Sequence, residues 1–128
     1  MRTLSVSSFN AIEAEFQARR NAVLVARLRT EMNVVPTGMS DADVIAQIMP
    51  VIKDARALGF AEDENDLLRF VALAFLPEPA RQDPFLSDNF QRCLGNVEYH
   101  PSDRLDFAYK HIVPKAYRFC AATATENL

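Results

Sequence analysis

The sequence contains no tryptophan, three glycines and two cysteines, and each shortage narrows the functions to consider. Two cysteines, Cys93 and Cys120, do not make the disulfide framework of a small secreted domain. We therefore expect two reduced, half-buried thiols. Glycine-rich stretches are absent, and the chain has no phosphate-binding loop, no dinucleotide fingerprint and no His-Glu metalloprotease motif. The residues therefore give no sign of the commonest catalytic and nucleotide-binding motifs.

The chain also lacks excess positive charge and long apolar runs. Its net charge of -3 gives no support for nucleic-acid binding, which usually needs a basic surface. The apolar cluster nearest the N-terminus, residues 22–26, is short and flanked by Arg20 and Arg27, unlike a secretory signal. The most apolar stretch, residues 67–76, is far too short to span a bilayer. We expect a cytoplasmic protein with neither a membrane nor a nucleic-acid partner.

The remaining composition is that of a small helical domain. With 128 residues and 49% apolar content, the chain can form a core without disulfides or metals. We expect a single domain over residues 1–128. No stretch alternates between apolar and polar residues as a half-buried strand does. The predicted fold class is all-α, a compact bundle of about five helices.

Residues 55–76 contain the strongest local signals. Gly59 can take the left-handed conformation that ends a helix, and Phe60 can pack back on its last turn. Four acidic residues between 62 and 66 then suit the positive end of a new helix. From residue 67 to 76 only Arg69 is charged. A helix that is apolar all round is buried, so we predict a central helix near residues 62–76, with 63–76 as its helical range.

Caps and periodicity place the other helices at residues 7–32, 40–58, 84–94 and 102–113. The expected caps are Ser7 or Ser8, Ser40, Asp83 and Ser102. Pro50 predicts a kink or a division into two short helices. We expect residues 77–84 to be turn-like and extended, because they contain three prolines. Pro114 should end or bend the last main helix, and residues 121–128 should fray.

Candidate chemistry is weak. Cys93, His100, His111 and Cys120 contain no closely spaced ligand pair, so we predict no metal site and no cofactor. The acidic residues 62–66 lack the spacing of a calcium loop. A Cys/His nucleophile pair remains the alternative in which the chain is a small enzyme, since such partners meet in space rather than in sequence. We assign no catalytic residue.

Nine phenylalanines are more than five short helices obviously need. Phe107 falls outside the apolar stripe of its helix, and Phe85 follows a proline-rich turn. Exposed apolar patches mark interfaces, so the surplus predicts a protein-binding surface. Arg104, Asp106 and Lys110 suggest a charged surface beside it, with Asp106 and Lys110 spaced as an i,i+4 pair. The candidate partner-binding residues are Phe85, Phe90, Arg104, Phe107 and Lys110.

Part of the sequence resembles a known class of proteins. The run Ala55-x-x-Leu58-Gly59-Phe60, then Asp63-x-x-Asp66-Leu67-x-Arg69-Phe70-Val71-x-Leu73-Ala74-Phe75, then Arg104-Leu105-Asp106 resembles small helical proteins encoded beside type VI secretion spike and effector genes in bacteria. The likeness covers residues 40–113. Asp83-Pro84-Phe85 is similar to the aromatic helix start of those proteins. Their usual Gly-Pro turn is replaced here by Leu76-Pro77-Glu78-Pro79.

The resemblance implies a cytoplasmic accessory protein without catalytic residues. It would bind a secreted effector or the spike before secretion, as an adaptor or chaperone. An immunity protein that neutralises a toxin is the alternative, because acidic immunity proteins often mask basic toxin sites and this chain is mildly acidic.

Overall fold

The computed structural model describes the backbone of residues 6–126 and the side chains of residues 11–122. Over this range the fold is all-α, as predicted, and no strand occurs. The contacts divide the chain into residues up to 45 and residues from 46 onward, with the boundary inside α2. Each unit is described by itself, and a single domain over residues 1–128 stays a prediction.

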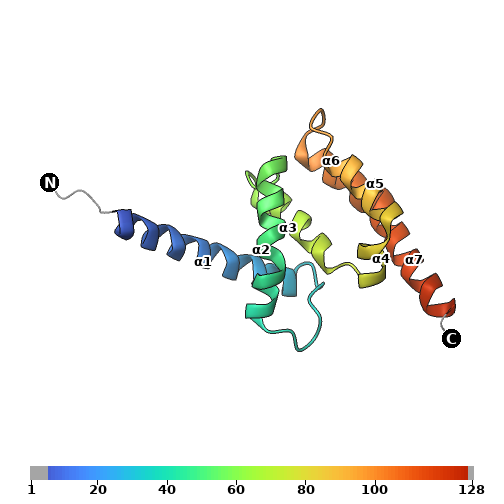
Figure 1. Cartoon of the computed structure of the whole chain (residues 1–128), viewed down its shortest axis with the longest axis horizontal. Coiled ribbons are helices and arrows are strands. Elements are labelled where there is room, and N and C mark those ends of the chain that lie inside the picture. Colours follow the sequence, from blue (N-terminus) through green and yellow to red (C-terminus); the bar gives the residue numbers. More distant parts are fainter. Residues whose placement is uncertain (1–5, 127–128) are drawn as a thin grey trace. The chain divides into compact units, whose positions relative to one another are not determined.

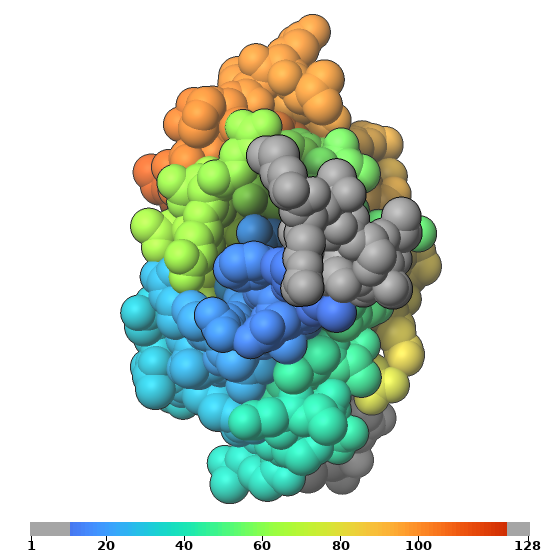
Figure 2. All heavy atoms as spheres, turned by 90° about the vertical axis from the view of Figure 1, so that its left-hand side faces the viewer, coloured from blue at the N-terminus to red at the C-terminus, as the bar shows by residue number. Residues whose placement is uncertain are grey.

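The first unit contains α1 (Val6–Thr30) and the start of α2 (Asp41–Leu58). Helix α1 begins before Ser7 and Ser8, so the prediction that either serine caps it is wrong. Ser40 does cap α2, since its Oγ accepts a hydrogen bond from the Asp43 N–H at 3.1 Å. The loop between the helices lies at the surface (Figure 2, cyan to teal). Arg29 anchors it by donating to the Met39 carbonyl at 2.6 Å and to Asp41 at 2.7 Å.

Helix α2 continues through Pro50, so the prediction of two short helices is wrong. Pro50 is exposed, and its ring therefore does not compete with core packing. The end of α2 follows the sequence signals closely. Gly59 has φ +89°, and the Phe60 N–H donates to the Ala55 carbonyl at 2.8 Å. Phe60 is fully buried, which makes this turn a fixed corner of the second unit.

The predicted central helix is α3 (Glu64–Ala72) followed by η1 (Leu73–Phe75), a 3₁₀ turn. Asp63 caps α3 by accepting from the N–H groups of Asn65 and Asp66. Six of the nine α3 residues are buried, whereas η1 contains none. Burial is thus confirmed for α3, and its 3₁₀ end is left half-exposed.

The proline-containing segment after η1 contains a short helix, α4 (Glu78–Gln82), where we expected extended chain. Pro79 occupies an early helical position, where its missing N–H costs no hydrogen bond. Helix α5 (Pro84–Leu94) has the predicted bounds, and the Leu86 N–H donates to Asp83 at 2.9 Å. The prolines of this segment therefore occupy the first turns of α4 and α5 and do not prevent helix formation.

The C-terminal rod is α6 (Pro101–Phe107), η2 (Ala108–Ile112) and α7 (Val113–Glu126), and α5 packs alongside it (Figure 1). His100 rather than Ser102 caps α6, by accepting from the Ser102 N–H at 3.2 Å. Pro114 does not end the helix, because η2 is a wider π-helical turn at the place where the proline ring would meet the preceding turn. Helix α7 extends to Glu126, and the expected fraying of residues 121–128 stays a prediction. Residues 127 and 128 lie outside the described range.

Candidate functional site

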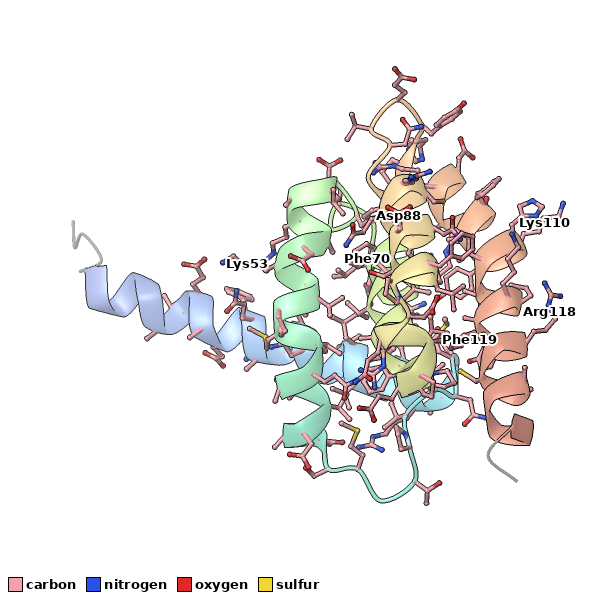
Figure 3. The ribbon with its side chains drawn as sticks, turned by 45° about the vertical axis from the view of Figure 1, so that its right-hand side comes forward. Lys53, Phe70, Asp88, Lys110, Arg118 and Phe119 are labelled. Atoms are coloured by element: carbon pink, nitrogen blue, oxygen red, sulfur yellow. The ribbon has the colours of Figure 1, made fainter. Side chains whose placement is uncertain are left out.

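An open apolar groove of about 720 Å³ lies within the second unit. Helix α2, the α3–η1 segment, α4 and α5 supply its walls. Its apolar lining includes Phe70, Leu73, Phe90 and Leu94, and the exposed residues Asp54, Arg81 and Gln91 provide polar groups at the rim. Figure 3 shows Phe70 between α2 and α5. The volume of the groove falls in the range of pockets that hold ligands or anchoring side chains.

The floor of the groove is rigidly supported. The Phe70 ring stacks on Phe60 with centroids 4.7 Å apart. The Arg104 guanidinium lies over the other ring, 4.6 Å from the Phe60 centroid. On the opposite wall, Phe90 packs against the buried cluster of Leu76, Ala80, Leu86 and Ala116. The apolar residues of the groove are therefore held in place by the core behind them.

Arg104 is buried, with 5% of its surface exposed, so the predicted charged surface at this position is wrong. Its Nη1 donates to the Leu94 carbonyl at 2.7 Å, and its Nε donates to the Tyr99 carbonyl at 3.0 Å. These bonds supply donors to one carbonyl at the end of α5 and to one in the loop that follows it. Arg104 thus joins three segments of the unit and presents little surface to a partner.

A second polar network links α3 to α6. Asp66 is buried and accepts from the Ser102 hydroxyl at 3.0 Å. Arg69 bonds Asp106 at 2.6 Å and approaches Asp66 at 3.4 Å. The Tyr109 hydroxyl donates to the Arg69 carbonyl at 2.5 Å, and burial raises the pKa of Tyr109 well above its usual value. Asp106 is therefore bonded to Arg69 in this network, whereas the sequence spacing predicted a pair with Lys110.

The other candidate partner-binding residues lie on different faces. Phe90 lines the groove. Phe85 is 72% exposed near the start of α5 and is not part of the groove lining. Phe107 and Lys110 are exposed on the rod, and the Phe107 ring contacts the His111 ring at 4.6 Å. The five residues thus do not form one surface.

The Cys93 thiol shows no activation. Cys93 is half-buried and its Sγ donates to the Arg104 carbonyl at 3.2 Å. Burial raises the pKa of Cys93, although the nearby Arg104 charge opposes this, so the reactive thiolate is disfavoured. Among the residues that the structure describes, no group of three or more His, Cys, Asp or Glu side chains is arranged to hold a metal ion.

Sequence reasoning missed most of the groove and a row of cations on the rod. Leu73 was expected to be buried within the central helix, yet it is half-buried and lines the groove. Lys115 and Arg118 continue the helical spacing of His111, at i+4 and i+7. The break expected at Pro114 concealed that periodicity, which a continuous helix would have revealed.

Comparison with protein-family models, with curated proteins and with solved structures found no match for this chain. Within the described residues, no helix combines the length and the apolar character that a membrane crossing requires.

Proposed function

We propose that this chain is a non-enzymatic protein-binding module, a cytoplasmic adaptor or chaperone for a type VI secretion effector or spike protein. The observation that carries the protein-binding part is the apolar groove of the second unit. The secretion role rests on the sequence resemblance alone. An amphipathic helix is the occupant that suits the groove, since such helices place apolar anchors into grooves of this kind.

The groove suits a side-chain anchor better than a reacting substrate. Its walls are mainly aliphatic and aromatic, and its polar groups lie at the rim. Every buried nitrogen or oxygen among the described side chains already has a hydrogen-bond partner. Arg104, for example, donates to the Leu94 carbonyl at 2.7 Å. The buried polar groups are therefore committed to holding the helices together.

The test is affinity purification of the tagged protein at native expression, with co-purifying proteins identified by mass spectrometry. The proposal expects one dominant partner with an effector or spike domain. A clean protein under conditions where secretion genes are expressed would contradict it.

An immunity protein is the second candidate, favoured by the mildly acidic charge of -3. The two roles differ in cells. Loss of the effector after deletion of the gene supports the chaperone, whereas protection from the toxin by this protein alone supports the immunity protein.

A further inference from the structure

The outer face of the C-terminal rod carries a basic stripe, which we define as Lys110, His111, Lys115 and Arg118. All four side chains are exposed. Figure 3 shows Lys110 and Arg118 projecting from the same side of the rod, away from α5. His111, Lys115 and Arg118 are spaced by four and three residues, which places them on neighbouring turns of one face, and Lys110 directly precedes His111.

The stripe has no acidic residue of its own. No aspartate or glutamate occurs between Asp106 and Glu126 in the sequence. Asp106, at its start, is already bonded to Arg69 at 2.6 Å. On the adjacent α5, Asp88 is paired with Arg92 at 3.0 Å. Among residues 11–122, Lys110, Lys115 and Arg118 make no ion pair, so three cations lie unneutralised on a chain whose net charge is -3.

A hollow with a mixed lining accompanies these charges. It is a pocket of about 350 Å³ between α5 and the rod, with Cys93, Phe107 and Ile112 as its apolar lining. Its polar lining consists of Asn89, Arg92, His111 and Lys115, and Arg92 is paired with Asp88. Phe107 is 54% exposed at one end of the stripe. Cations and apolar side chains thus occur at the same hollow, as a surface that binds an acidic amphipathic segment requires.

We propose that the basic stripe and its hollow bind an acidic amphipathic segment of a partner protein, with carboxylates along one face and an apolar side chain for the hollow. From Phe107 to Arg118 the rod rises about 17 Å, which matches about three turns of a partner helix. A protein segment is favoured over nucleic acid because the rest of the chain is acidic and would repel a polyanion. The inference does not depend on the groove proposed above.

The test uses the full chain and a fluorescent peptide of about 12 residues, in which glutamate and leucine repeat with helical spacing. Lysine replaces glutamate in the control peptide. We expect the acidic peptide alone to bind, with an affinity that falls as salt is raised. The triple variant Lys110→Gln, Lys115→Gln, Arg118→Gln should bind it about ten-fold more weakly.

The matched control, Arg20→Gln, Lys53→Gln, Arg56→Gln, removes three exposed cations outside the stripe and should change binding less than about two-fold. Phe107→Ala should weaken binding without changing its salt dependence, and Ala57→Arg in the groove should not weaken it. Equal losses in both triple variants, no binding by the wild type, or tighter binding to anionic lipid vesicles or duplex DNA would each overturn the proposal.

Discussion

Replacing Arg104 with methionine tests how the core behind the groove is held. Arg104→Met keeps most of the buried volume but removes the bonds to the Leu94 and Tyr99 carbonyls, which measure 2.7 and 3.0 Å. It also removes the cation over the Phe60 ring. The end of α5 would then have a buried carbonyl without its donor.

The expected loss follows from these contacts. Hydrogen bonds to charged groups contribute roughly 1.5–3 kcal/mol each, and a cation over an aromatic ring adds about 0.5–2 kcal/mol. The cost of burying the guanidinium opposes part of this gain. We therefore expect the free energy of unfolding to fall by about 3 kcal/mol in Arg104→Met, with Arg104→Lys in between.

Urea denaturation followed by circular dichroism measures the change. Arg92→Met is the matched control, because its pair with Asp88 is exposed and should contribute less than about 0.5 kcal/mol. A loss below about 1 kcal/mol in Arg104→Met, or one equal to that of the control, would refute the view that Arg104 holds the end of α5.

Three further outcomes are expected. Gly59→Ala should lower the free energy of unfolding by about 1 kcal/mol, as measured by thermal unfolding. The cost comes from the backbone, because φ is +89°, whereas the added Cβ would meet no atom closer than 3.8 Å. The native Cys93 thiol, in a Cys120→Ser background, should react with an aromatic disulfide reagent far more slowly than in denaturant, because burial raises its pKa. Burial also raises the pKa of Tyr109, so the unfolded chain loses its phenol proton first and stability should fall as pH rises above about 10. In Tyr109→Phe this dependence, followed by urea unfolding at several pH values, should be weaker.

Local signals predicted the caps of α2 and α5 and missed those of α1 and α6. Ser40 and Asp83 accept the N–H bonds that their positions suggested, and Gly59 takes the left-handed turn. These features are set by residues within one turn of each other, which is why a sequence can reveal them. The all-α class follows from the same information.

Features that depend on tertiary packing were missed. Arg104 resembles a surface residue in sequence, and its burial depends on two carbonyls and a ring that the fold brings together. The π turn at Ala108–Ile112 lets the helix continue through Pro114, and a helical pattern with a proline gives no sign of it. The basic stripe was hidden for the same reason, because its spacing requires an unbroken rod.

The residues behind the resemblance have structural roles here. Asp66, Arg69 and Asp106 link α3 to α6, and Arg104 supports Phe60. These four residues lie apart from the groove lining, whereas Leu58, Phe70, Leu73 and Ala74 of the same run contribute to it. Evidence about the partner must therefore come from the exposed surfaces.

The most direct test of the central claim is the affinity of Ala57→Arg for the partner recovered with the wild-type protein. Ala57 lines the groove and is exposed, so arginine fills the groove without disturbing the core or the helix. Ala46→Arg, exposed on the same helix and outside the groove, is the control. Binding through the groove predicts a rise in Kd of at least about ten-fold for Ala57→Arg and less than about two-fold for Ala46→Arg, measured by calorimetry. Equal Kd values for the two variants would contradict it.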